Sequence, residues 1–194
     1  HHVITTSERI SRGLRDALWL NPSRLTCIPT GVDLERFNTV ISGNLHEELK
    51  LPPHTTFVGM ISVLRSWKRH EDFVEAASRL AKQFPDAHFV IAGGGNDTKL
   101  KQIRELAESK GLRHRLHCLG YRVDIPQLLA SYTVLVLPSS AHEGIPQIIL
   151  QAQAMAKAVV GTTVGGIPEV VVDRETGLLV PPCNPPDLAS AIGQ

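Results

Sequence analysis

Short apolar runs alternate with longer amphipathic stretches along this chain. The apolar runs fall at positions 3–5, 26–28, 56–63, 88–92, 116–119, 134–137, 158–161 and 178–180. Most of them are apolar at every position, which is typical of strands covered on both faces, as in a parallel sheet. The pattern therefore predicts parallel strands rather than a meander of half-exposed ones.

Helical patterns fill the intervals between these runs. The predicted helices cover 8–19, 71–84, 97–110, 125–131, 145–157 and 187–192, with a short one opened by Pro168. In the second helix one apolar stripe at helical spacing contains Phe73, Ala76, Ala77, Leu80 and Phe84. The alternation predicts an α/β fold with an open, doubly wound parallel sheet and right-handed crossovers. In such a sheet a ligand binds beyond the carboxyl ends of the strands, where the strand order reverses.

A charged loop follows the third predicted strand. It reads Leu-Arg-Ser-Trp-Lys-Arg over 64–69 and brings three cations together before a helix. A solvated charge run is the ordinary explanation of such a sequence. This loop, however, lies at the ligand end of the sheet, where the guanidinium of Arg65 and the ammonium of Lys68 suit phosphate oxygens.

A second loop, after the sixth predicted strand, enters a helix through Glu143 and Gly144. Free N–H groups and the positive end of the dipole make a helix start a site for anions. Further along, Gln147 and Gln151 share one helix face and have apolar neighbours, so their amides need partners. Those partners are either other core groups or the hydroxyls of a bound polyol or ribose.

Three further loops at the same end carry weaker signals. Gly31 follows the second predicted strand. Gly93 and Gly94 follow the fourth, and Tyr121 and Arg122 follow the fifth. The glycines permit a tight turn or the close approach of a backbone or a ligand. An aromatic ring beside a guanidinium suits a nucleobase, although a plain exposed loop explains the pair equally well.

Composition excludes several classes of protein. The chain has 20 basic and 19 acidic residues and a formal net charge of +1, so we expect no nucleic acid among its partners. Cys27, Cys118 and Cys183 lie far apart, and we expect free thiols in a reducing compartment. No apolar run approaches the roughly 18 residues of a membrane span, and no secretory signal is visible. We therefore expect a cytoplasmic protein.

A nucleophile triad, a resident metal and a dinucleotide site are not indicated. Ser139 and His142 lie close in sequence, but that is not a catalytic geometry. The spacing of His114, His117 and Cys118 on a predicted strand does not suit a metal. No glycine fingerprint opens the first β–α unit, which makes a dehydrogenase a distant alternative. We expect no metal and no organic cofactor.

Six short motifs occur in order and at normal spacing. They are Ile-Pro-Thr-Gly-Val-Asp-Leu-Glu-Arg-Phe at 28–37, Val-Ile-Ala-Gly at 90–93, Leu-Gly-Tyr at 119–121, Glu-Gly-Ile-Pro at 143–146, Val-Gly-Gly-Ile-Pro-Glu at 164–169 and Thr-Gly-Leu-Leu-Val-Pro-Pro at 176–182. Together they resemble the donor-binding, C-terminal half of GT-B glycosyltransferases of the retaining family four, or group 1. The resemblance covers nearly the whole chain and implies one Rossmann-like domain over 1–194 that binds a nucleotide-diphospho-sugar.

By position, the resemblance also implies a role for each loop. Lys68 is the phosphate-binding lysine, and Glu143 is the first glutamate of an E-x7-E motif that contacts the donor sugar or its phosphate. The turn that holds the sugar and diphosphate contains Gly144, Ile145, Pro146 and Gln147. The base lies against Tyr121 and Arg122, and the loops near the donor contain Gly31, Gly93 and Gly94.

Two positions depart from the family pattern. The usual arginine, five residues before the lysine, falls on Val63, and we expect Arg65 to supply the charge from two residues later. The second glutamate of E-x7-E, which usually holds the ribose hydroxyls, falls on Gln151. A glutamine accepts one hydroxyl and donates to another but lacks charge-assisted strength. These departures favour, as an alternative, a nucleotide-sugar-binding domain without catalysis.

The resemblance implies partners outside this chain. In the family an acceptor-binding half precedes this segment and a closing helix follows it, so we expect donor binding but negligible transfer from the chain alone. The full enzyme would glycosylate a sugar, lipid or polysaccharide acceptor in polysaccharide or glycolipid synthesis. A peripheral position at the cytoplasmic membrane stays open, and a GT-B-like nucleotide-sugar epimerase is the enzymatic alternative.

Overall fold

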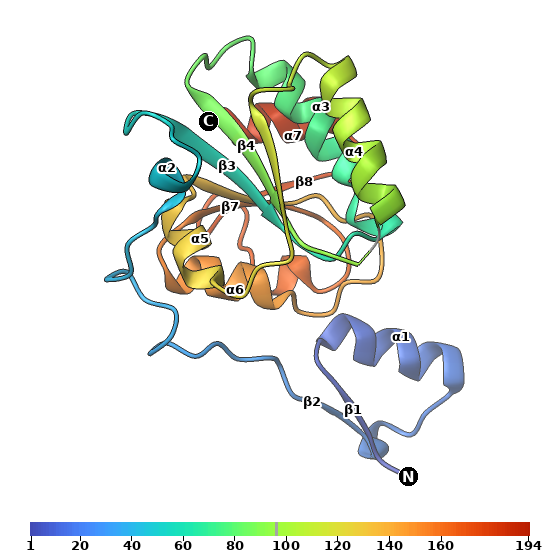
Figure 1. Ribbon diagram of the computed structural model, residues 1–194. Helices are drawn as coiled ribbons and strands as arrows, with labels where there is room; N and C mark the ends of the chain where they lie inside the picture. The colour runs from blue at the N-terminus through green and yellow to red at the C-terminus, as the bar shows by residue number, and fades with distance from the viewer. Residues whose placement is uncertain (96) are drawn as a thin grey trace.

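The structure, a computed structural model, describes residues 1–95 and 97–194. Its main body is a six-stranded sheet in the order β5-β4-β3-β6-β7-β8, and every neighbouring pair is parallel (Figure 1). The strands are β3 (Thr56–Ile61), β4 (Ala87–Ala92), β5 (Leu116–Gly120), β6 (Val134–Leu137), β7 (Ala158–Thr162) and β8 (Leu178–Val180). The predicted α/β fold with a doubly wound parallel sheet is confirmed.

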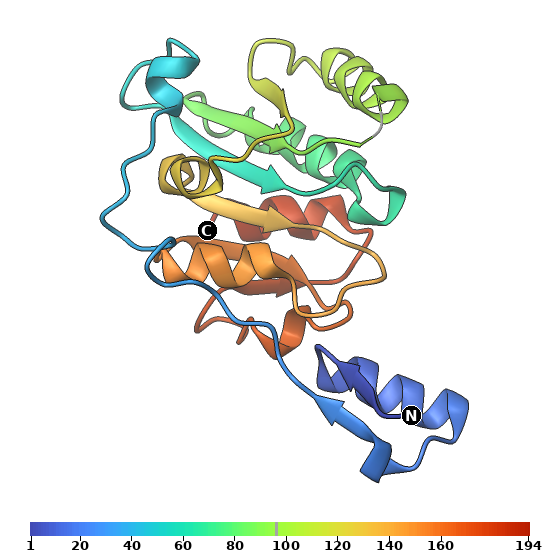
Figure 2. The ribbon, with the colours of Figure 1, turned by 60° about the horizontal axis from the view of Figure 1, so that its bottom comes forward.

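Helices cover both faces of this sheet, as Figure 2 shows. One face packs against α3 (His70–Leu80), α4 (Asp97–Ser109) and α7 (Pro185–Ile192). The other packs against α2 (Leu45–Glu48), α5 (Ile125–Ser131) and α6 (Gln147–Ala154). Since successive side chains of a strand point to opposite faces, Val58 and Met60 join the first core and Phe57 joins the second. This double burial explains why the strands are apolar at every position.

The strand order reverses between β3 and β6. From β3 the chain proceeds outward through β4 and β5, then returns to β6, which lies on the other side of β3 and is followed outward by β7 and β8. β3 and β6 are joined through the pairs Val58–Val134 and Gly59–Leu135. The loops that follow these two strands therefore leave the same edge of the sheet side by side, which is the position predicted for a ligand.

The first two strands lie outside this sheet. β1 (Val3–Thr5) and β2 (Leu25–Cys27) form a parallel pair of their own, with α1 (Glu8–Leu18) between them. Figure 1 shows this unit beside the main body, joined to it by an extended segment. The strands predicted at 3–5 and 26–28 are therefore present, but they lie outside the doubly wound sheet. Whether 1–194 forms a single domain stays a prediction.

Some predicted boundaries also differ from the structure. β3 ends at Ile61 rather than at 63, and α6 begins at Gln147 rather than at 145 because Pro146 has an extended backbone and serves as its N-cap. The helix expected at Pro168 is a 3-10 turn, η3 (Ile167–Glu169). Three short elements were not predicted: α2, and the 3-10 turns Pro22–Arg24 (η1) and Ser66–Lys68 (η2).

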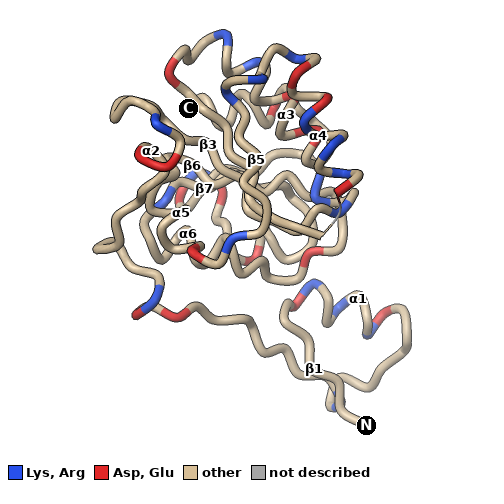
Figure 3. The backbone as a smooth tube through the Cα atoms, in the orientation of Figure 1, with Lys and Arg blue, Asp and Glu red and all other residues tan. Residues whose placement is uncertain are grey.

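Basic and acidic positions are interspersed along α3 and α4 (Figure 3). Glu75 of α3, for example, pairs with Arg79 on the same helix at 3.6 Å and with Lys110, just beyond α4, at 2.5 Å. In these pairs, opposite charges lie close together on this side of the sheet. None of the described helices is both long enough and apolar enough to span a membrane.

Candidate functional site

The two loops at the reversal point meet through an ion pair. The turn η2 after β3 carries Lys68, and the loop after β6 carries Glu143. Nζ of Lys68 donates a hydrogen bond to Oε1 of Glu143 at 2.5 Å, and the side chains are only 15% and 6% exposed. The structure thus brings together two predicted residues that lie 75 positions apart in the sequence.

A buried serine also donates a hydrogen bond to the carboxylate of this ion pair. Oγ of Ser139, just after β6, donates to the same Oε1 of Glu143 at 2.5 Å, and the serine is fully buried. The carbonyl of Ser139 accepts in turn from Oγ1 of Thr162, in β7, at 2.6 Å. A buried carboxylate oxygen needs such donors, so Ser139 and Thr162 fix where Glu143 stands. Sequence reasoning missed both, although two hydroxyls at the ends of buried strands are an available signal.

Arg65 lies on the outer side of the same loop. Its guanidinium is 5.8 Å from the ring centroid of Trp67, and the Trp67 ring meets His142 edge to face at 5.3 Å. The backbone N–H of Ser140 donates to the carbonyl of Trp67 at 2.7 Å, which joins the two loops a second time. Of the two predicted cations, Lys68 therefore reaches Glu143, whereas Arg65 packs against Trp67.

The loop after β7 packs against the turn that follows Glu143. Gly165 has φ +58°, and a Cβ there would collide with the backbone carbonyl of Glu143. The N–H of Gly166 donates to that same carbonyl at 3.0 Å. The paired glycines of the Val-Gly-Gly motif are thus explained by close backbone contact with residues 143–144.

Gln147 and Gln151 are joined to each other and to a distant loop. Nε2 of Gln147 donates to the carbonyl of Gly31 at 2.7 Å. Nε2 of Gln151 donates to Oε1 of Gln147 at 3.2 Å. The structure therefore brings the predicted residue Gly31 beside α6, next to the helix start that follows Glu143.

The glycines after β4 lie between neighbouring loops. Gly93 has φ +151°, and a Cβ there would collide with the backbone carbonyl of Ser62, just after β3. A Cβ on Gly94 would lie 3.2 Å from Cβ of Tyr121. The close approach of backbone explains Gly93, and the Tyr121 side chain, 78% exposed, stands at the ligand end of β5. Their predicted role beside the donor stays a prediction.

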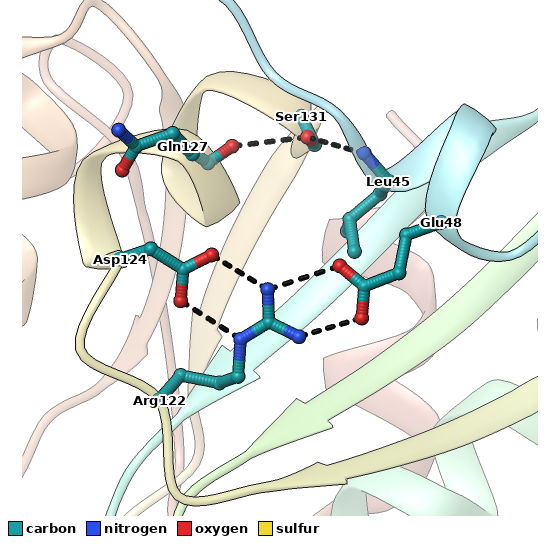
Figure 4. A network of polar contacts seen from close by, with 6 residues as sticks. All are labelled: Leu45, Glu48, Arg122, Asp124, Gln127 and Ser131. Atoms are coloured by element: carbon teal, nitrogen blue, oxygen red, sulfur yellow. Dashed lines mark hydrogen bonds and ion pairs between the residues drawn. The ribbon is translucent and has the colours of Figure 1, made fainter.

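The side chain of Arg122 is already engaged (Figure 4). Nε and Nη2 donate to the carboxylate of Asp124 at 2.8 and 2.6 Å, and Nη1 and Nη2 donate to that of Glu48, in α2, at 2.6 and 2.9 Å. Hydrogen bonds to Asp124 and then to Glu48 raise the pKa of the guanidinium and keep it charged. This double fork holds α2 against the start of α5, so any contact of Arg122 with a base is left mainly to its backbone.

The beginning of α1 also touches the site. The two carboxylate oxygens of Glu169 accept the backbone N–H groups of Glu8 and Arg9, each at 2.9 Å. A Cβ on Gly144 would lie 2.9 Å from Oγ1 of Thr6. The β1–α1–β2 unit therefore contacts the turn after Glu143. The local sequence pattern does not predict this contact.

A second buried group lies beside the charged loop. His70 is fully buried, and its Nε2 is 3.1 Å from Oγ of Ser62. Burial lowers the pKa of His70 to about 4, so its ring is neutral at physiological pH. Over the described residues, no group of three or more His, Cys, Asp or Glu side chains is arranged to hold a metal.

Comparison with known proteins gives one family for most of the chain. Residues 52–194 match the family described as glycosyl transferases group 1. A protein of Escherichia coli named UDP-Gal:alpha-D-GlcNAc-diphosphoundecaprenol alpha-1,3-galactosyltransferase is 35% identical over 170 residues, which are 84% of this chain and 43% of that protein. A D-inositol 3-phosphate glycosyltransferase of Corynebacterium glutamicum (strain R) is 29% identical over 181 residues, 89% of this chain and 43% of that protein.

Solved structures agree in fold. A glycosyltransferase from Rickettsia africae has a TM-score of 0.93 at 25% identity, over 99% of this chain and 52% of that one. Alr3699/HepE of Anabaena, solved with UDP-glucose, has a TM-score of 0.89 at 26% identity, over 99% and 53%. The chain thus spans about half the length of the solved relatives and less than half that of the curated ones.

Proposed function

The chain belongs to the group 1 glycosyltransferases, and we propose that it forms the part of such an enzyme that binds a nucleotide-diphospho-sugar. The sugar would pass, with retention of configuration, to an acceptor bound elsewhere in the full protein. Support comes from the family match over 52–194 and from the UDP-glucose held by the solved Anabaena relative.

One observation carries the proposal: the shielded ion pair of Lys68 and Glu143 stands at the reversal point of the sheet. Removing an ammonium and a carboxylate from water costs several kcal/mol per ion, and apolar residues would fill the same space without that cost. Stability alone is therefore a weak reason for this pair. A ligand that uses both charges is a better one, because this edge of the sheet is where α/β folds bind ligands.

In the proposed reaction, the bond between the donor sugar and its phosphate is broken. Negative charge develops on the departing diphosphate, and a fixed cation lowers the barrier by stabilising it. We assign this role to Lys68, with the backbone N–H groups at the start of α6 beside it. Glu143, whose Oε1 is shared by Lys68 and Ser139, keeps its second oxygen for a hydroxyl of the donor sugar.

The remaining predicted residues complete the donor site in this proposal. Arg65, held over Trp67, is the second cation and turns toward the diphosphate in place of the family arginine that Val63 replaces. Gln151 meets the ribose, and the base lies near Tyr121. No resident metal is included in the proposal.

The acceptor belongs to a part of the protein that this chain does not span. We expect a sugar, lipid or polysaccharide acceptor, and donor binding without appreciable transfer by these 194 residues alone. The two curated relatives are named as glycosyltransferases, so the epimerase alternative has no support from them.

Thermal unfolding in the presence of nucleotides tests the proposal. The chain is heated with UDP, GDP, ADP or CMP, each with and without an attached sugar. A ligand at about 100 times its Kd adds about 2.7 kcal/mol to the free energy of unfolding, or roughly 5–10 °C in a domain of this size. We expect such a rise with one base, and no rise with any of them contradicts donor binding by this chain.

The variant Lys68→Ala identifies the site. It should bind the same nucleotide at least about tenfold more weakly, because a charge-assisted contact is worth roughly 1.5–3 kcal/mol. Lys101→Ala removes an exposed lysine from α4 and should leave binding unchanged. Equal binding by all three proteins would place the ligand elsewhere, and the melting temperature without nucleotide shows whether each variant folds.

A further inference from the structure

Two glutamine side chains of α6 form a chain of two hydrogen bonds, here called the relay, which ends on the backbone of a distant segment. Gln147 donates from Nε2 to the carbonyl of Gly31, 116 residues away, at 2.7 Å. Gln151 donates from Nε2 to Oε1 of Gln147 at 3.2 Å. Residues 147 and 151 are one helical turn apart, so both side chains emerge from the same face of α6.

The relay has only one chemically allowed direction. The carbonyl of Gly31 only accepts hydrogen bonds, so Gln147 must turn its NH2 group toward it. The oxygen of Gln147 then faces Gln151, and only the NH2 group of Gln151 completes that bond. The oxygen of Gln151 is thereby turned away from Gln147, and no group of the described residues donates to it.

We propose that Gln147 is a positioning residue, which fixes the amide of Gln151 so that its oxygen accepts a hydrogen bond from a hydroxyl of the nucleotide ribose. The inference rests on the proposed function, in which Gln151 meets the ribose. A carboxylate presents an oxygen in either orientation, whereas a free amide turns over and presents its NH2 group as readily. An amide therefore needs a neighbour that fixes its orientation, and Gln147 with Gly31 supplies it.

A purely structural role for the relay makes a different prediction. If Gln147 only ties α6 to the segment around Gly31, its loss should weaken binding whatever residue occupies position 151. If Gln147 orients the amide, its loss should matter only while position 151 is an amide. The two explanations are separated by measuring the same substitution in two backgrounds.

The experiment compares UDP with 2′,3′-dideoxy-UDP by isothermal titration calorimetry. The readout is the ratio of the two Kd values, which reports contacts to the ribose hydroxyls and cancels general losses of affinity. Should the nucleotide screen select another base, the diphosphate of that base and its dideoxy form replace these two. The proteins are the unchanged chain, Gln147→Leu, Gln151→Glu and the double variant.

We expect the unchanged chain to prefer UDP about tenfold, since one or two hydrogen bonds of ordinary strength are lost with the hydroxyls. Gln147→Leu should lower this preference to below about threefold. Gln151→Glu should keep the preference, and adding Gln147→Leu to it should change nothing. Gln153→Leu is the matched control, because Gln153 also lies on α6 and donates to a backbone carbonyl, that of Val170, at 2.8 Å.

Three results would overturn the inference. They are an unchanged preference in Gln147→Leu, an equal loss in both backgrounds, or an unchanged chain that binds UDP and its dideoxy form alike. All three leave donor binding intact. A chain that binds no nucleoside diphosphate at all refutes the proposed function and this inference with it, so the two failures are told apart.

Discussion

At the scale of single residues, His70 makes the stability of the chain depend on pH. The ring is fully buried beside the charged loop, and its pKa falls from about 6.5 in an unfolded chain to about 4 in the folded one. Between these two values the unfolded chain binds a proton that the folded chain does not. The stabilising contribution is therefore complete above about pH 6.5 and is lost as the pH falls toward 4.

The expected size of this effect follows from linkage. From pH 7 to pH 5 the free energy of unfolding should fall by about 2 kcal/mol on account of His70 alone. Urea unfolding at several pH values checks this, because His70→Gln should remove that part of the slope, whereas His114→Gln, at an exposed position, should leave it in place. An unchanged slope in His70→Gln would mean that the ring takes up its proton in the same pH range in the folded and the unfolded chain.

Single residues also show which contacts of the site can be predicted from the sequence and which cannot. Lys68 and Glu143 were predictable as occupants of one edge of the sheet, because each lies in the loop that follows a strand and the carboxyl ends of parallel strands share one edge. Of the two partners of Arg122, Glu48 was not predictable, since it lies 74 residues away on a four-residue helix without a periodic pattern. The role of Ser139 was missed because it depends on the burial of this serine just after β6, which the local sequence does not show.

At the scale of elements, Gly165 lets the loop after β7 support the loop after β6. Its positive φ and its closeness to the carbonyl of Glu143 both exclude a side chain. Gly165→Ala should therefore lower the free energy of unfolding by about 2 kcal/mol or more and weaken nucleotide binding, because Glu143 must move. Denaturant unfolding and calorimetry measure the two effects.

Gly13 provides the matched control for this prediction. It lies inside α1, where a Cβ would meet no atom within 4 Å. Gly13→Ala should be neutral or stabilise by up to about 1 kcal/mol, because alanine has the higher helix propensity. The same substitution should thus have opposite signs at the two positions, and similar losses at both would contradict the steric explanation.

Element types were predictable where the pattern is long or fully apolar. The six strands of the main sheet and the helices α3 and α4 follow from such patterns; β6 and β8 have the predicted bounds, and the other elements differ at one or both ends by one to a few residues. β1 and β2 were predicted as strands, but three residues of partly exposed strand do not specify which sheet they join.

At the scale of the whole molecule, Glu169 joins the β1–α1–β2 unit to the main body. Its carboxylate satisfies the first two N–H groups of α1, and Ser7 satisfies the third by accepting from Ile10 at 3.1 Å. A helix start is stabilised by such acceptors and by negative charge. This contact spans more than 160 residues of sequence and stands against the turn after Glu143.

Hydrogen exchange measures this contact directly. Glu169→Ala should speed exchange of the Glu8 and Arg9 amides about fivefold or more, because a lost cap costs about 1 kcal/mol. Glu175→Ala removes an exposed carboxylate nearby in sequence and should leave both amides unchanged. Equal exchange in the two variants would show that α1 holds its place without Glu169.

The reversal of strand order has a consequence for how the chain reaches its native state. β3 and β6 become neighbours only when the whole α3–β4–α4–β5–α5 segment between them forms a closed loop, and pairings of this range are the slow ones in folding. Lys68 follows one of these two strands and Glu143 follows the other, so their ion pair forms only once β3 and β6 have paired. Nucleotide binding during refolding should therefore lag behind helix formation and mark the moment at which the two halves of the sheet join.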